Sequence, residues 1–164
     1  MVCPQLLAIV SSTLAQMRNP VSMAATDTTT AEWLSVLDDT RRRVAATDDL
    51  DVVASGVEVA WRTARAVTVP EDLASENWWA YLAEAIGDAA EELQRAGVPL
   101  TLGAGTAPTG PLSDQAVLRD AAAQLATALH AGLTRSVAAG AEPAAALAAA
   151  HAAARVERAL VTGR

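Results

Sequence analysis

DLASENWWAYLAEAIGDAAEELQRAG, at residues 72–97, is the stretch that most clearly specifies a local structure. On a helix its bulky apolar side chains fall within one narrow arc, and most of its charged side chains fall on the opposite side. The apolar arc consists of Trp79, Leu82, Ile86 and Leu93. The pattern predicts an amphipathic helix that packs against a core, but it carries no chemical motif.

Both ends of this expected helix carry boundary signals. Residues 68–71, TVPE, have the form of a capping box, with a proline in the first turn, where its missing N–H costs nothing. Gly97 is followed by Val98 and Pro99, an order that suits a Schellman motif in which Val98 folds back onto Leu93. We therefore expect a helix whose start and end are both set by the local sequence.

Composition and length indicate one all-helical domain. The chain has 164 residues, which is enough to bury a core, and alanine and leucine are its most frequent residues. Strand-like alternation is absent, and glycine and proline are concentrated between the periodic segments. All 12 basic residues are arginines, which indicates the coding bias of a GC-rich, actinobacterial genome.

Charge and hydropathy narrow the classes of partner. The net charge is −7 and the pI is about 4.7, so we expect no nucleic-acid partner. Nothing in the sequence approaches the ~18 consecutive apolar residues that a membrane span requires. The apolar run at 6–10 lacks a preceding positive charge, so we expect a cytoplasmic rather than a secreted protein. Cys3 is the only cysteine, which leaves no internal disulfide and no thiolate metal cluster.

Apolar periodicity predicts an all-α bundle of about five main helices. Their expected ranges are 30–46, 49–67, 72–97, 113–139 and 143–161. A further short helix over residues 4–18 would belong to an N-terminal arm or extension at 1–22, and residues 23–164 would form a single domain. The glycine- and proline-rich stretch 97–112 is expected to be a flexible loop. Ser113 would cap the helix that follows, and the short connection at Gly140 predicts a C-terminal antiparallel helical hairpin.

The expected helix at 49–67 is apolar on two nearly opposite sides. Trp61 lies on one side and Val59 on the other. Such a helix is either central in a bundle or part of a subunit interface, and we favour the central position. Val59 and Trp61 are nevertheless candidate contact residues, because apolar surface that one copy leaves uncovered would be available to a partner.

Trp78 and Tyr81 are the candidate exposed aromatic residues. With Trp79 buried, Trp78 falls at the edge of the apolar arc and Tyr81 further out, because adjacent helical residues point about 100° apart. Aromatic side chains at such positions commonly close the edge of a core. They also serve as interface anchors, and a group of them can hold a cationic ligand.

Arg62 and Arg65 are the basic candidates near these aromatic residues. They could pair with the acidic side of the helix at 72–97 if the two helices pack antiparallel. Alternatively, either arginine could line a pocket together with Trp61 and Trp78.

No catalytic, metal-binding or cofactor-binding motif is present. His130 and His151 would lie at similar heights in the hairpin, but no spacing of His, Cys, Asp or Glu matches a metal site. There is no Ser/His/Asp arrangement, no glycine-rich phosphate loop and no Walker lysine. We therefore predict no catalytic residue, no metal and no cofactor, and we favour a function other than catalysis.

These observations predict a protein that acts by association. The leading hypothesis is a non-catalytic protein–protein interaction or assembly module, which binds a protein partner or self-associates. Spare apolar surface on the helices at 49–67 and 143–161, together with Trp78 and Tyr81, would supply the contact. One alternative is a small-molecule-binding bundle, either a sensor or an unusual enzyme, with a Trp-lined pocket. A further alternative is an acidic inhibitor or immunity-type protein that masks a basic partner.

Overall fold

The computed structural model describes residues 20–68, 72–101 and 107–162, and it describes side chains from Thr29 onward. The described residues form five α-helices and no strand, so the prediction of an all-helical protein is confirmed. The helices are α2 (Pro20–Ala45), α3 (Leu50–Ala66), α4 (Leu73–Arg95), α5 (Gln115–Ala138) and α6 (Pro143–Thr162). The short helix expected at 4–18 lies outside the described residues.

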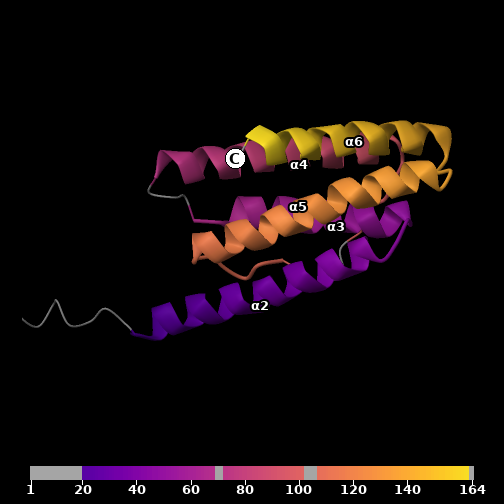
Figure 1. The fold of residues 1–164 in the computed structure, drawn as a ribbon. Helices are drawn as coiled ribbons and strands as arrows, with labels where there is room; N and C mark the ends of the chain where they lie inside the picture. Colours follow the sequence, from indigo (N-terminus) through magenta and orange to yellow (C-terminus); the bar gives the residue numbers. More distant parts are fainter. Residues whose placement is uncertain (1–19, 69–71, 102–106, 163–164) are drawn as a thin grey trace, which may run out of the picture.

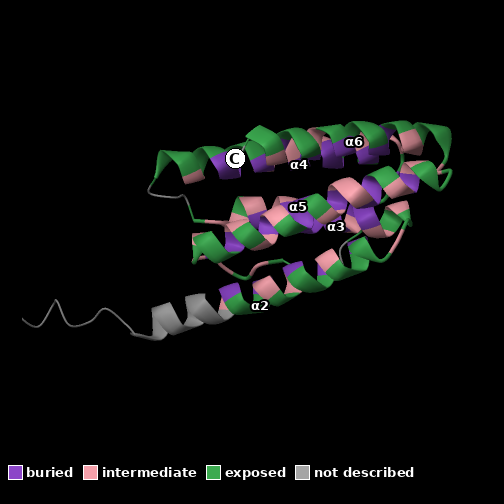
Figure 2. Ribbon diagram, in the orientation of Figure 1, coloured by how far each residue is buried: buried purple, intermediate pink, exposed green. Residues whose placement is uncertain are grey.

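The five helices stack in three layers (Figure 1). α4 and α6 lie side by side in one outer layer, α3 and α5 form the middle layer, and α2 forms the opposite outer layer. α5 and α6 run in opposite directions and are joined by the short turn at Gly140 (Figure 1). Buried residues face the spaces between layers and exposed residues face outward (Figure 2). This arrangement leaves one side of α4, α6 and α2 in contact with solvent.

α2 is longer than the sequence pattern indicated. The helix begins at Pro20 rather than near residue 30, so it runs through residue 22, where we expected a boundary. Its far end is stabilised from α5, because Arg135 donates to the carbonyl oxygens of Val44, at 2.8 Å, and Thr47, at 3.0 Å. Helix-end carbonyls have no partner within their own helix, and a guanidinium at this end also complements the helix dipole.

The start of α4 differs from the prediction. Its N-cap is Asp72, whose carboxylate accepts a hydrogen bond from the Ser75 backbone N–H at 2.8 Å. This hydrogen bond holds the pKa of Asp72 below its usual value. Thr68 is not the predicted cap, because α4 begins at Leu73 with Asp72 as its N-cap. The N–H and the hydroxyl of Thr68 both donate to the Leu112 carbonyl.

The end of α4 follows the prediction. Val98 N–H donates to the Leu93 carbonyl at 3.0 Å, and Gly97 adopts a φ of 80°, a left-handed conformation that glycine adopts without strain. Val98 is itself buried. The Schellman motif predicted from Gly97, Val98 and Leu93 is therefore present.

The connection from α4 to α5 is attached to the bundle at its end. Val67 and Leu112 form an isolated β-bridge, and Leu112 is fully buried. Ser113 does not occupy the N-cap position of α5 as predicted, and its backbone N–H donates to the Thr30 hydroxyl of α2 at 3.1 Å. The N-cap position is instead occupied by Asp114, in a left-handed conformation and without a side-chain cap bond. Residues 102–106 lie outside the described structure.

Two glycines allow α2, α3 and α5 to pack closely. A Cβ on Gly56 of α3 would lie 2.8 Å from Val44 of α2 and 2.9 Å from Leu129 of α5. A Cβ on Gly132 of α5 would lie 3.0 Å from Val53 of α3. Because interiors are close-packed, these crossings leave no room for a cavity at the centre of the three helices.

Candidate functional site

Two of the candidate contact residues are covered within the chain. Val59 is 2% exposed and Trp78 is 6% exposed. α3 packs against α2, α4 and α5, which explains why both of its apolar sides are covered. Val59 and Trp78 therefore present little surface to a protein partner.

Trp78 lies at the junction of α4 and α5. Its ring meets Trp79 edge to face, with ring centroids 4.7 Å apart and an interplanar angle of 86°. The Arg119 guanidinium of α5 lies 5.0 Å from the centroid of the Trp78 ring, within the range of a cation–π contact. Arg119 thus occupies one face of the Trp78 ring.

Trp61, Arg62 and Arg65 lie together on α3, but each contacts a residue of its own helix. Arg65 stacks 4.9 Å from the centroid of the half-buried Trp61 ring. Arg62 Nε donates to Oε1 of Glu58 at 2.8 Å, which neutralises a carboxylate that is almost fully buried. The three residues line a hollow of about 250 Å³ together with Ala107 and Pro108.

The structure does not bring Trp61 and Trp78 into one hollow. Trp78 lines a separate one of about 350 Å³, which includes Arg119, Gln124 and Leu160. A third hollow, of about 640 Å³, lies between the starts of α4 and α5 beside Trp79. Within the described residues, Trp79 Nε1 is a buried donor without a hydrogen-bond partner.

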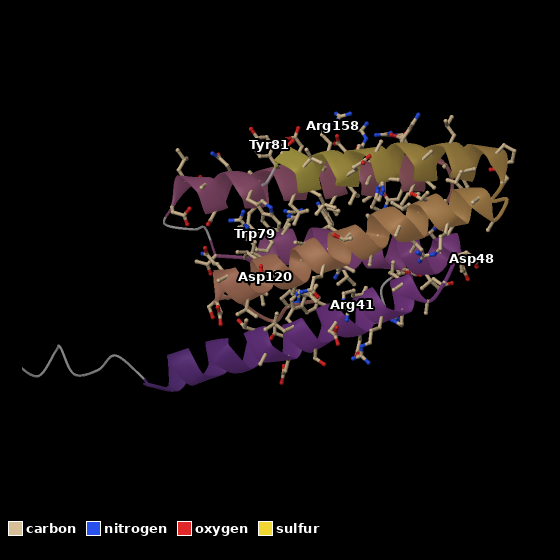
Figure 3. All side chains as sticks on the ribbon, in the orientation of Figure 1. Arg41, Asp48, Trp79, Tyr81, Asp120 and Arg158 are labelled. Carbon is tan, nitrogen blue, oxygen red and sulfur yellow. The ribbon has the colours of Figure 1, made fainter. Side chains whose placement is uncertain are left out.

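Tyr81 is the exposed aromatic candidate, with 49% of its surface exposed. It lies with Arg158 on the outer side of the layer formed by α4 and α6 (Figure 3). Tyr81, Glu84 and Asp88 of α4 and Arg155 and Arg158 of α6 line a shared hollow of about 240 Å³. This hollow combines an aromatic ring with charges of both signs.

A network of charged residues joins α4 to α6, and sequence reasoning did not find it. Arg155 Nη1 lies 2.6 Å from Oδ2 of Asp88, and His151 Nδ1 lies 2.9 Å from Oε1 of Glu92. The hydrogen bond from His151 holds the pKa of Glu92 below its usual value, and the charges of Arg155 and Arg95 act in the same direction. The acidic side of α4 therefore pairs with α6, not with Arg62 and Arg65.

The two histidines have different partners. His130 Nδ1 lies 3.1 Å from the Ala153 carbonyl oxygen, whereas His151 contacts Glu92. Among the described residues, no group of three or more His, Cys, Asp or Glu side chains is placed to hold a metal ion.

The outward side of α6 carries two large exposed apolar side chains. Leu147 is 59% exposed and Val161 is 68% exposed, and Ala150 and Ala154 between them are also exposed. The sequence of α6 indicates this exposure, because a helix that is apolar on all sides has more apolar surface than contact with one neighbouring helix covers. The exposed residues of this side include Leu147, Ala150, His151, Ala154, Arg158 and Val161. We call these six residues the α6 outer face.

Comparison with known proteins does not identify this arrangement. The chain matches no protein-family model, no curated protein and no solved structure. None of the described helices combines the length and apolar character needed to cross a membrane.

Proposed function

We propose that this protein is a non-catalytic interaction module that binds another protein surface through the outer side of its α4–α6 layer. The observation that carries the proposal is the distribution of large exposed apolar side chains. Of the five such residues in the described structure, only Val117 lies outside α4 and α6. The other four are Leu73, Tyr81, Leu147 and Val161.

Packing of the interior supports association over ligand capture. The central residues of all five helices are covered, and glycines close the crossings of the middle layer. The hollows beside Trp61, Trp78 and Tyr81 lie at the surface and are lined in part by paired charges. Exposed apolar side chains flanked by charges are typical of the centre of a protein interface.

Tyr81 is the residue that we expect to act as an anchor. A tyrosine offers a large apolar ring at low entropic cost and a hydroxyl that can form a hydrogen bond. It is half exposed, and Glu84, Asp88 and Arg158 around it can orient a partner. The overall charge of −7 opposes contact with nucleic acid and is compatible with a protein partner.

Site-specific photocrosslinking in the native host tests the proposal. A photoreactive benzophenone amino acid would replace Tyr81 or Leu147 in the outer layer, and Val117 would serve as the control outside it. We expect the first two positions to crosslink to the same protein, which includes a second copy of this chain as one outcome, and Val117 not to do so. The complex should re-form from purified components and weaken with Tyr81→Ala. Identical products from all three positions, or none from Tyr81 and Leu147, would contradict the proposal.

A second candidate function, small-molecule binding, is favoured by one observation. The buried indole N–H of Trp79 has no acceptor among the described residues, and the neighbouring hollow contains Ser75, Gln115 and Arg119. Burying an N–H donor without an acceptor destabilises the fold. A ligand oxygen atom that accepts a hydrogen bond from this N–H would recover that free energy. Tryptophan fluorescence against a panel of carboxylates and phosphates tests this function, and a flat response across the panel counts against it.

A further inference from the structure

The start of α5 lacks the carboxylate cap found at the starts of α3, α4 and α6. In those three helices a carboxylate accepts a backbone hydrogen bond, from Asp49, Asp72 and Glu142 respectively. Asp114 stands at the corresponding position of α5, but its left-handed backbone conformation comes with no side-chain cap bond. The backbone N–H groups of residues 115–117 have no acceptor among the described residues. The start of α5 therefore presents unpaired donors at the positive end of a helix dipole.

A further unpaired donor lies at the same place. Trp79 and Ala116 both line the hollow of about 640 Å³ between the starts of α4 and α5. Figure 3 shows Trp79 in the space between these two helices. The residue is 4% exposed, and its Nε1 atom has no hydrogen-bond partner in the described part of the chain. Because a buried donor without an acceptor is rare and unfavourable, the hollow is expected to receive an oxygen atom from a ligand.

The charged residues of the hollow favour a ligand without net charge. Two carboxylates, Asp72 and Asp120, and one guanidinium, Arg119, contribute to its lining. Arg119 is held over the Trp78 ring, and Asp72 is occupied as the N-cap of α4. Asp120 is exposed and has no ion pair or hydrogen bond with the described residues. A phosphate would bring further negative charge to this lining, in a chain whose net charge is −7.

We propose that this hollow binds a free α-amino acid in its zwitterionic form. The ligand's carboxylate accepts hydrogen bonds from Nε1 of Trp79 and from the first-turn N–H groups of α5, where it acts as the missing cap. The ligand's ammonium group donates to the Asp120 carboxylate. This site is separate from the α6 outer face. The inference therefore goes beyond the protein contact proposed above, and it names the ligand class of the second candidate function.

The spacing along α5 suits the short distance between the two charged groups of an amino acid. Ala116 and Asp120 are four residues apart, so they lie on one side of the helix at a separation of about 6 Å along its axis. Helical side chains lean toward the N-terminus, which brings the Asp120 carboxylate closer to the first turn. One α-amino acid can therefore reach Asp120 and the unpaired N–H groups together.

The indole N–H signals of the full chain in nuclear magnetic resonance test the site directly. The chain has four tryptophans, and the Trp79 signal is the one that Trp79→Phe removes. Titration with the proteinogenic L-amino acids should shift this signal in a saturable way for at least one of them, because a hydrogen bond to a carboxylate changes the environment of the N–H. No saturable shift of the Trp79 signal with any amino acid would overturn the inference.

Calorimetry with the amino acid that binds most tightly tests the two polar contacts. Trp79→Phe and Asp120→Asn should each weaken binding at least about tenfold, because each variant loses a hydrogen bond to a charged group. Asp48→Asn is the matched control and should bind as the wild type does. Asp48 is exposed, has no ion pair with the described residues and lies at the opposite end of the bundle (Figure 3). Unchanged affinity in Trp79→Phe and Asp120→Asn would refute the site.

Derivatives of the same amino acid test the zwitterion. The N-acetyl derivative lacks the ammonium group and the amide lacks the carboxylate, so each should bind at least about tenfold more weakly. An N-acetyl derivative that binds as tightly as its parent would refute the ammonium contact. A shift of the Trp79 signal by inorganic phosphate alone would refute the amino acid and leave the second candidate function standing. No result here depends on Tyr81 or Leu147, so a failure leaves the contact through the α4–α6 layer to be judged by photocrosslinking.

Discussion

Nη1 of Arg155 on α6 lies 2.6 Å from Oδ2 of Asp88 on α4, and Nη2 of the same guanidinium lies 3.6 Å from Oε2 of Glu92. Arg155 and Asp88 are both partly exposed to solvent. Ion pairs of this kind contribute only about 0–1 kcal/mol, because water and salt screen them and ordering the side chains costs entropy. The buried apolar residues between α4 and α6 therefore contribute more to holding these helices together than the ion pairs do.

Arg155→Ala should accordingly have a small effect on stability. We expect the free energy of unfolding, measured by urea denaturation, to fall by less than about 1 kcal/mol. A loss several times larger would show that the α4–α6 layer depends on this ion pair rather than on the apolar contacts beneath it.

The lowered pKa of Glu92 predicts that the fold loses stability in acid. Its pKa in the folded chain lies below the unfolded value near 4.5, so its contribution is complete above that value and is lost as the pH falls through the folded pKa. Glu92→Gln should therefore show a smaller decline in the free energy of unfolding between about pH 5 and about pH 3 than the wild type. Glu157→Gln is the matched control, because Glu157 has no ion pair in the described structure. Equal declines in wild type and Glu92→Gln would refute the assignment.

Adding a single methyl group at Gly56 is predicted to lower the free energy of unfolding. Its Cβ would lie 2.8 Å from Val44, a branched side chain in a packed crossing, so Gly56→Ala should destabilise the fold by about 1–3 kcal/mol despite the better helix propensity of alanine. Gly87→Ala is the control, since its Cβ would lie 3.3 Å from the half-buried Trp61 ring. We expect Gly87→Ala to change stability by less than about 1 kcal/mol. Chemical denaturation of both variants checks the contrast, which fails if Gly56→Ala is as stable as Gly87→Ala.

Arg135 should contribute more to the stability of the fold than the exposed arginines do. It donates to carbonyl oxygens at the end of α2, which have no other partner in their own helix. Removing a charged donor from such groups costs about 1–3 kcal/mol, so Arg135→Ala should lower the midpoint of thermal unfolding clearly. Arg95→Ala is the control, because the exposed Arg95 pairs only with Glu91 and Glu92 of its own helix and caps no carbonyl among the described residues. Similar midpoints for the two variants would contradict the capping role.

Trp33 and Trp79 offer a comparison of two buried indoles. Trp33 Nε1 donates to the Thr63 hydroxyl at 2.9 Å, whereas Trp79 Nε1 has no acceptor among the described residues. Replacement by phenylalanine removes similar volume at both sites, but only Trp33→Phe also breaks a hydrogen bond. We expect Trp33→Phe to be more destabilising than Trp79→Phe by about 1 kcal/mol in urea denaturation. The reverse order would indicate that the Trp79 N–H has an acceptor.

The sequence predicted helix features correctly where these features depend only on residues close together in the chain. The Schellman motif at Gly97 depends only on residues next to it, and the apolar arc around Trp79 and Ile86 is buried as expected. The predicted start of α4 was wrong because Asp72 caps the helix, whereas Thr68 pairs with Leu112, which is distant in the sequence. The early start of α2 was missed because residues 20–29 carry no apolar periodicity.

The candidate site was less predictable, because exposure depends on which helices become neighbours. Angular position placed Trp78 at the edge of the α4 arc, but α5 covers that edge and brings Arg119 over the ring. Val59 is covered because α3 lies in the middle layer. Tyr81 remains exposed, and the outward side of α6 is free of neighbours within the described chain.

Photocrosslinking from Leu147 in the native host, compared with Val117, tests the central claim most directly. Both side chains are exposed, but only Leu147 lies in the α4–α6 layer. We predict that a photoreactive residue at Leu147 forms one discrete crosslinked product with a protein partner and that the same residue at Val117 does not. The same product from both positions, or no product from Leu147, would contradict binding through this layer.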